Sequence, residues 1–377
     1  MSKNKDETWK IVTQTNMATY SLRNIFRLLW INKFKISFKY IPRFLYALFM
    51  SAITLPLRVI EKIRFQKKIK STVISEDPIF IIGFYRTATT LLHILFSKDK
   101  RLGYMSNLDI FTALFNLSFE KTSRRILEKR LPKTRPMDNI EMNVDGPQEE
   151  AYAISTTLEF AAPNAMIFPQ NYDYFVKYIS LDECPEKDLK RWKDTYQYFV
   201  KKTTFKHEGK QLVLKDPANS TRIKHLLAMY PNAKFIYTYR DPYPLLCSLK
   251  LLFQKLMELS ALQTWDEDVI DSKFIRQLGR FYSGFLKSKH LIPPENFYTL
   301  KYEDFIVNPL QYLKEIYEKF GLDDFEQVKP ALQEYLVAKK NYKTNTHDIT
   351  PKIIQTVNEE LEDYRINHGY DRLNKDN

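Results

Sequence analysis

Residues 78–95 read PIFIIGFYRTATTLLHIL, and this stretch predicts a strand, a tight turn and a helix in succession. Ile79 to Ile82 form a short, continuous apolar run, which is typical of a strand buried on both faces. Gly83 ends this run and opens the turn, and an apolar segment with helical spacing begins at Leu91. A turn of this kind points backbone N–H groups and a helix N-terminus at an anion, usually a phosphate.

The residues of the turn narrow the kind of anion site that it can form. Its polar side chains are Arg86, Thr87, Thr89 and Thr90. A nucleotide-hydrolysing P-loop has the pattern Gly-x-x-x-x-Gly-Lys-Ser/Thr, whose lysine contacts the terminal phosphates. Counted from Gly83, the second glycine position holds Ala88 and the lysine position holds Thr89, so the lysine of a kinase or ATPase is absent. The alternative is an ordinary turn whose threonine caps the helix.

The composition of the chain is that of a packed globular protein. It has 377 residues, 44% hydrophobic and 14% aromatic, enough for one large domain with insertions or two modest ones. The two cysteines, Cys184 and Cys247, lie far apart, which suits a reducing compartment, and the six histidines show no metal-ligand spacing. The start of the chain is polar and contains acids, so we expect no signal peptide and a cytoplasmic location.

Positive charge is concentrated in the first part of the chain. Residues 1–70 carry a net +12 of the total +13, which argues against a nucleic-acid partner for the rest. Residues 44–57 (FLYALFMSAITLPL) carry no charge, but they fall short of the roughly 20 residues of a membrane-spanning helix. Two interpretations remain open: peripheral membrane contact through residues 20–70, or a helical subdomain packed on the catalytic domain. We therefore divide the chain into a basic, apolar, helical segment, 1–75, and a catalytic domain, 76–377.

Two more predicted strands end in residues that suit an anion. Lys215 follows the apolar run 212–214, and Arg240 follows the run 235–239, with Ser248 eight residues further on in a predicted helix. The carboxyl ends of strands are where open α/β sheets bind ligands. An arginine fork suits a phosphate monoester, and a serine hydroxyl can add a further donor.

The residues Asp145-Gly146-Pro147 predict a turn. An acidic pair, Glu149 and Glu150, follows this turn and is predicted to start a helix. Carboxylates in a first helical turn are favoured by the helix dipole alone. The functional alternative is a general base that removes a proton from an acceptor hydroxyl. Further along, residues 185–206 predict a charged, aromatic-rich helix, which we expect in a solvated outer layer.

The motif FYRTATTLL resembles the phosphosulfate loop of the sulfotransferases, whose nearest branch reads R-S-G-T-T-x-L. The same branch carries L-K-x-P, as in residues 214–217, and R-x-P…S, as in residues 240–248. The segment around Tyr302-Glu303-Asp304 and the tail around 342–353 extend the resemblance, which runs from about residue 40 to 370.

This resemblance implies a P-loop-like α/β fold with a mostly parallel sheet and helices on both faces. It implies transfer of a sulfuryl group from 3′-phosphoadenosine 5′-phosphosulfate, without a metal, to a hydroxyl or amine of a small molecule, lipid or glycan. The residues expected to bind the donor are Gly83, Tyr85, Arg86, Thr87, Ala88, Thr89, Thr90, Arg240 and Ser248. We expect Arg86 and Lys215 to stabilise the transferring group, with Glu150 or Glu149 as the base.

The chain also departs from the family pattern. Ala88 stands where the loop usually has glycine, and we expect this position to be helical already, so that alanine fits. Pro217 occupies the place of the histidine base of the cytosolic sulfotransferases, which leaves the glutamate pair for that role. The alternatives to a sulfotransferase are a kinase-like P-loop enzyme and a non-catalytic protein that binds membranes or nucleic acid through residues 1–70.

Overall fold

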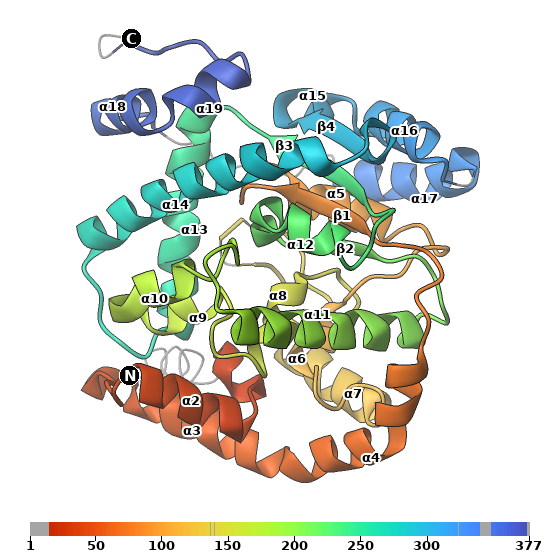
Figure 1. Ribbon diagram of the computed structural model, residues 1–377, viewed down its shortest axis with the longest axis vertical. Coiled ribbons are helices and arrows are strands. Elements are labelled where there is room, and N and C mark those ends of the chain that lie inside the picture. The colour runs from red at the N-terminus through yellow and green to blue at the C-terminus, as the bar shows by residue number, and fades with distance from the viewer. Residues whose placement is uncertain (1–14, 136, 139, 323, 340–347, 375–377) are drawn as a thin grey trace. The chain divides into compact units, whose positions relative to one another are not determined.

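The computed structural model describes residues 15–135, 137–138, 140–322, 324–339 and 348–374. Residues 1–14 of the predicted basic segment and 342–347 of the predicted terminal loop lie outside this part. The chain divides into two compact units, coloured along the sequence in Figure 1. Unit 1 comprises Met1–Ile74, Met105–Gly209 and Leu252–Ile270, and unit 2 comprises Ser75–Tyr104, Lys210–Leu251 and Asp271–Asn377.

Unit 2 is built on a four-stranded sheet in the order β2-β1-β3-β4. Every pairing in it is parallel, and Ile81 of β1 lies between Lys215 of β2 and Ile236 of β3. The strands are β1 (Ile79–Gly83), β2 (Val213–Lys215), β3 (Lys234–Tyr239) and β4 (Phe297–Lys301). The helices are α5 (Thr89–Phe96), α12 (Ile223–Leu227), α15 (Tyr302–Val307), α16 (Pro309–Phe320), α17 (Phe325–Ala338), α18 (Pro351–Glu360) and α19 (Glu362–Asn367). The predicted strands and the parallel α/β class are confirmed.

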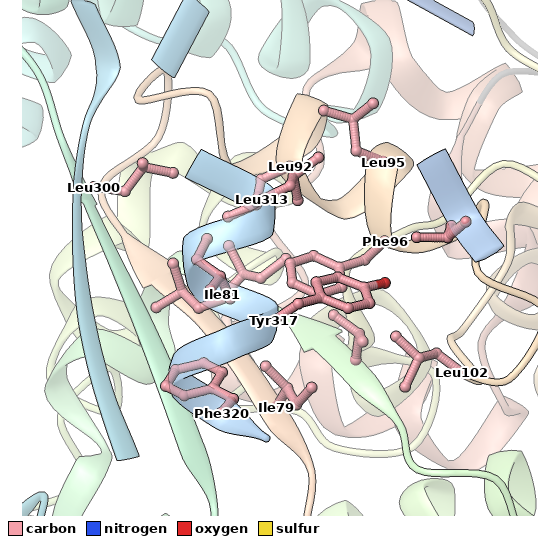
Figure 2. Close-up of a cluster of buried hydrophobic side chains, with 14 of the residues drawn as sticks. Ile79, Ile81, Leu92, Leu95, Phe96, Leu102, Leu300, Leu313, Tyr317 and Phe320 are labelled. Carbon is pink, nitrogen blue, oxygen red and sulfur yellow. The ribbon is translucent and has the colours of Figure 1, made fainter. Parts of the chain in front are cut away.

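Helices cover both faces of this sheet, as predicted. On one face, Ile79 and Ile81 pack into a buried apolar cluster with side chains of α5, α16 and α17 (Figure 2). On the other face, Phe80 contacts Tyr230, and the ring of Tyr237 stacks on that of Phe285 with centroids 3.8 Å apart. A strand buried on both faces must be apolar throughout, which is why β1 reads as an uninterrupted apolar run.

Among its described residues, unit 1 consists of helices, the turns and loops that connect them, and isolated bridges. Its helices are α2 (Leu22–Ile31), α3 (Ile41–Ile53), α4 (Leu55–Ser71), α6 (Asn107–Phe111), α7 (Glu120–Arg130), α8 (Glu150–Ser155), α9 (Asn164–Ile167), α10 (Tyr172–Val176) and α11 (Glu186–Lys206). Two long helices, α13 (Pro242–Ser260) and α14 (Glu267–Ser288), contribute residues to both units.

The prediction that residues 185–206 form a solvated outer helix is wrong in one respect. The helix exists as α11, but it buries one whole face, including Trp192, Tyr196, Phe199 and Val200. These residues recur at helical spacing, so the charged residues between them occupy only the opposite face. The high charge content of this segment therefore led to the wrong prediction, whereas the spacing of its apolar residues indicates an amphipathic helix with one buried face.

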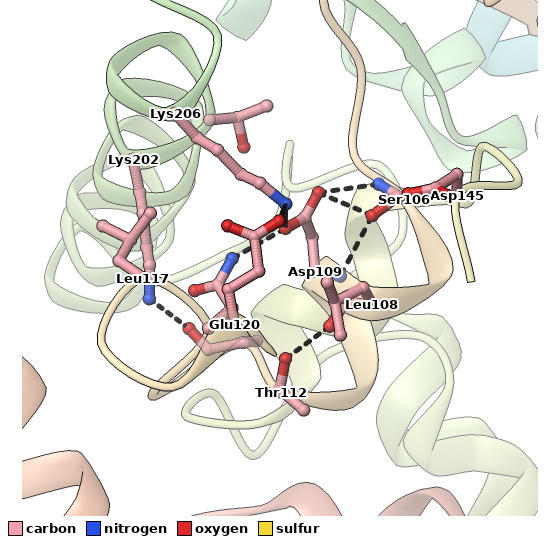
Figure 3. Close-up of polar contacts among 12 residues, drawn as sticks. Ser106, Leu108, Asp109, Thr112, Leu117, Glu120, Asp145, Lys202 and Lys206 are labelled. Atoms are coloured by element: carbon pink, nitrogen blue, oxygen red, sulfur yellow. Dashed lines mark hydrogen bonds and ion pairs between the residues drawn. The ribbon is translucent and has the colours of Figure 1, made fainter. Parts of the chain in front are cut away.

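Ion pairs of buried and half-buried side chains join α11 to α4 and α6 inside unit 1. Figure 3 shows Lys206 beside Asp109 in the second of these pairs. Lys202 of α11 lies 2.7 Å from the carboxylate of Glu61 on α4, and Lys206 lies 2.6 Å from that of Asp109 on α6. Glu61 also accepts hydrogen bonds from the backbone N–H groups of Leu117 and Ser118. Burial alone would raise the pKa of Asp109, but Lys206 and the hydrogen bonds hold it below its ordinary value.

The N-terminal helices of the described chain are fixed to the rest of unit 1. The backbone N–H of Ser21 donates to the carbonyl of Thr156, and the Asn24 side chain donates to that of Ser155. No single helix among the described residues is both long and apolar enough to cross a membrane. The segments Phe38–Ile53 and Leu55–Ser71, bent by 41° relative to each other, have the length and apolar composition of a membrane span only when taken together.

Candidate active site

The turn after β1 depends on glycine at position 83. Gly83 has φ +126°, and a Cβ there would lie 2.3 Å from the carbonyl oxygen of Thr238 on the neighbouring strand. The Ser220 hydroxyl accepts from the N–H of Gly83 at 2.8 Å and donates to its carbonyl at 3.1 Å. No sequence pattern singled out Ser220, because the chain segments that meet here are 137 residues apart.

The expectation that position 88 is helical is wrong. Ala88 is the N-cap of α5, with φ +66° and ψ 12°, and Arg86 is also left-handed, with φ +69°. A left-handed non-glycine residue costs about 1–2 kcal/mol. The turn contains two such residues, at positions 86 and 88. Backbone strain of this kind is concentrated at functional sites. Successive turn residues of this type make a concave row of N–H groups that suits an anion.

The threonines of the turn divide into a structural one and two that start α5. Thr87 is fully buried, and its hydroxyl donates to the Phe84 carbonyl at 2.7 Å and lies 2.6 Å from the hydroxyl of Thr238. Thr87 therefore acts by holding the turn closed. Thr89 and Thr90 begin α5, whose N-terminus has no side-chain cap.

The structure brings together three of the predicted donor-binding residues of unit 2. The Arg86 guanidinium donates from Nε to the Ser248 hydroxyl at 2.9 Å, and Arg240 donates from Nη1 to the Arg86 carbonyl at 3.1 Å. Residues from the β1 turn, the end of β3 and α13 thus meet at the start of α5. Tyr85 lies in the same turn, half-buried, with its ring 6.3 Å from that of Phe281.

Arg240 is held in place by two tyrosines that sequence reasoning did not assign to the site. Its guanidinium lies 4.1 Å from the ring centroid of Tyr302, a cation–π geometry. Its backbone N–H donates to the Tyr364 hydroxyl, which in turn donates to the Arg240 carbonyl. Nε of Arg240 is buried, and among the described residues it has no hydrogen-bond partner. A buried charged donor without a partner is costly, so this atom fits the role of binding an anion.

Lys215 ends β2, beside β1, and its side chain is buried. Near it lies His93 of α5, which the sequence did not single out; its Nε2 is 3.2 Å from the Val213 carbonyl. Burial, reinforced by the charge of Lys215, lowers the pKa of His93 to about 3. His93 is therefore neutral at physiological pH, and the ammonium of Lys215 provides the charge on this side of β1.

The two predicted base candidates belong to unit 1. Glu150 begins α8, as predicted, and is buried, with its carboxylate accepting from the Tyr196 hydroxyl at 2.8 Å. Glu149 is the N-cap residue of α8 and is half-buried. Glu149 has extended backbone, with φ −73° and ψ 129°, whereas Glu150 is the first helical residue, so the two carboxylates lie in different environments.

Comparison with known proteins identifies the class. A sequence model of the sulfotransferase family matches residues 78–327. The chain is 33% identical over 325 residues to the omega-hydroxy-beta-dihydromenaquinone-9 sulfotransferases Stf3 of Mycobacterium bovis and Mycobacterium tuberculosis, an overlap of 86% of this chain and 83% of theirs. The chain therefore belongs to the sulfotransferase family, and it is a transferase enzyme.

Solved structures agree on the fold. Sulfotransferase STF1 from Mycobacterium tuberculosis has a TM-score of 0.61 and 17% identity, with 85% of this chain and 88% of that chain covered. Sulfotransferase STF9 from Mycobacterium avium has a TM-score of 0.63 and 18% identity, with 85% of both chains covered. At these identities the likeness concerns the fold alone.

Proposed function

We propose that the sulfuryl donor is 3′-phosphoadenosine 5′-phosphosulfate and that unit 2 binds it through the β1 turn. The observation that carries the proposal is the meeting of Arg86, Ser248 and Arg240 at the uncapped start of α5. The turn and the helix start would hold the phosphosulfate. Arg240, with its unpartnered Nε, and Ser248 would hold the 3′-phosphate.

In the proposed reaction, an acceptor oxygen bonds to sulfur while the bond from sulfur to the bridging oxygen breaks. Negative charge collects on the bridging oxygen and on the sulfuryl oxygens. Arg86 and Lys215 would stabilise that charge, because preorganised cations in a buried site act without reorganising. The acceptor proton would pass to Glu150 or Glu149, a role that requires an ionised carboxylate.

We infer that the acceptor is a lipid hydroxyl. Support comes from the 33% identity to proteins whose names specify a hydroxylated menaquinone derivative as the acceptor. The two cysteines of the chain suit a reducing compartment, so the proposal places the enzyme in the cytoplasm.

The test has one arm for the donor and one for the acceptor. Adenosine 3′,5′-bisphosphate should raise the melting temperature of the purified chain, whereas ATP and AMP should do so much less. With sulfur-labelled donor, transfer should appear on a lipid extract and not on soluble glycans or small phenols. Stabilisation by ATP with Mg²⁺ instead would favour a kinase-like enzyme. Transfer to the soluble acceptors alone would reject the lipid acceptor and leave the donor intact.

A further inference from the structure

Helix α3 exposes a stripe of large apolar residues and buries its one charged residue, the reverse of a helix on the surface of a soluble protein. Ile41, Leu45, Phe49 and Ile53 recur every four residues and are exposed, with Phe49 60% exposed. Spacing of four places them on one stripe of the helix.

The neighbouring helices repeat this arrangement. On α4 the exposed stripe is Leu55, Val59 and Ile63, and on α2 it is Phe26 and Trp30; Ile63 and Trp30 are 78% and 75% exposed. Figure 1 shows α2, α3 and α4 in red and orange. Scattered apolar residues on a surface need no explanation, but stripes on three consecutive helices mark a contact site for an apolar partner.

The buried faces of these helices fix which side points outward. Arg43 of α3 donates to the carbonyls of Ala261 and Glu258, each at 2.8 Å. Arg58 of α4 donates to the Tyr20 carbonyl at 2.8 Å, and Glu61 holds the ion pair with Lys202. Rotating either helix to hide its apolar stripe would break these buried charged contacts, which is strongly unfavourable.

The charge around the stripes has a single sign. The exposed charged residues between positions 15 and 74 are Arg23, Lys33, Lys35, Lys39, Lys62, Arg64, Lys67, Lys68 and Lys70. The one acid in this range, Glu61, is buried in its ion pair. An apolar stripe bordered by cations is complementary to an anionic lipid surface. A second copy of the same face would instead oppose like charges, because a two-fold interface repeats the same surface on both sides.

We propose that the exposed face of α2, α3 and α4 docks unit 1 on an anionic lipid bilayer, lying in the interface without crossing it. Phe, Leu, Ile and Trp side chains enter the boundary between headgroups and acyl chains, and the lysines and arginines contact lipid phosphates. Docking does not require the chemistry proposed above, but it would bring a lipid acceptor to the enzyme.

Vesicle co-sedimentation of the full chain tests this proposal directly. The wild type should bind vesicles with about a third phosphatidylglycerol far better than neutral phosphatidylcholine vesicles. The triple variant Leu45→Gln, Phe49→Gln, Ile63→Gln should lose at least about tenfold in partitioning to the anionic vesicles. The pair Lys62→Gln, Lys67→Gln should lose about fivefold per charge on anionic vesicles and nothing on neutral ones.

A matched control separates docking from general surface hydrophobicity. Val307→Gln and Val337→Gln change residues of unit 2 that are 71% and 73% exposed, and this double variant should bind vesicles like the wild type. The proposal fails if the wild type does not bind, if the control loses as much as the triple variant, or if the triple variant only turns a dimer into a monomer. Stabilisation by adenosine 3′,5′-bisphosphate is measured on the same samples, so that a failure of donor binding is seen separately.

Discussion

The two units hold the positive charges of buried and half-buried side chains in different ways. In unit 1, Lys202 and Lys206 each face a carboxylate, so the protein neutralises its own cations. In unit 2, Arg240 has no carboxylate within ion-pair distance among the described residues and makes its side-chain hydrogen bond to a carbonyl. A cation paired by the protein builds the scaffold, whereas one that remains uncompensated is available to an anionic ligand.

The lack of a facing carboxylate is not by itself a sufficient criterion for a cation that binds an anionic ligand. Arg43 and Arg58 in unit 1 also bind carbonyls, and those of Glu258 and Ala261 lie at the C-terminal end of α13, where a cation is favoured. What distinguishes the site of unit 2 is the combination of arginines with an uncapped helix start and a left-handed turn.

The largest expected effect comes from two buried lysines. Lys215→Met in unit 2 should lower kcat by about 10²–10³-fold, because a preorganised charge at the transferring group is lost, while donor affinity falls less. Arg86→Ala should lower kcat to a similar extent, again with a smaller loss of donor affinity. Lys202→Met in unit 1 should destabilise folding by about 3–5 kcal/mol, because it leaves Glu61 unpaired, and kcat per folded molecule should stay near wild type.

Steady-state kinetics and urea unfolding of these variants separate the two roles. If Lys215→Met destabilises the protein as Lys202→Met does and turns over normally at saturation, then Lys215 belongs to the scaffold. If it weakens donor binding alone, its role is ground-state binding.

The sequence predicted what is local and left out what is made by distant contacts. The strands at Ile79, Val213 and Lys234 and the turn at Gly83 follow from apolar runs and short motifs. The same motifs named Arg240 and Ser248, which the fold brings to Arg86, while their roles in donor binding stay predictions. Ser220, Tyr302, Tyr364 and His93 were missed because each acts through segments brought together by the fold. Ala88 was misjudged because alanine carries no signal of positive φ, and the surrounding turn overrides its helical preference.

Arg240 should give the next largest effect. Arg240→Ala should weaken binding of adenosine 3′,5′-bisphosphate by about 2–3 kcal/mol, the range for hydrogen bonds to charged groups, and should remove the preference for this ligand over AMP. Titration calorimetry with both ligands measures this, with Arg43→Lys of unit 1 as the control that keeps the preference. A mutant that still prefers the bisphosphate as strongly as the wild type would place the 3′-phosphate elsewhere.

The glutamate pair should give a smaller but selective effect. Glu→Gln keeps the shape and removes the proton acceptor, so Glu150→Gln should lower kcat at least about tenfold with donor binding intact. Glu149→Gln is its matched control and should lose much less. Tyr196→Phe removes the hydrogen bond to Glu150 and tests whether that tyrosine positions it. Near-normal kcat in both glutamine variants would exclude the pair as the base.

The smallest effect concerns His93, which is buried beside Lys215. Its pKa is lowered by burial and by Lys215 to about 3 in the folded protein, below the ordinary 6.5, so below pH 6.5 the unfolded chain binds a proton that the folded protein does not. Stability from this group is therefore complete above pH 6.5 and is lost as pH falls towards 3. Between about pH 7 and about pH 5.5, the wild type should lose about 1 kcal/mol more unfolding free energy than His93→Gln. Urea unfolding of both proteins at the two pH values measures this difference, since other titrating groups are common to both. Equal losses would show that His93 is protonated in the folded state and adds a second positive charge beside Lys215.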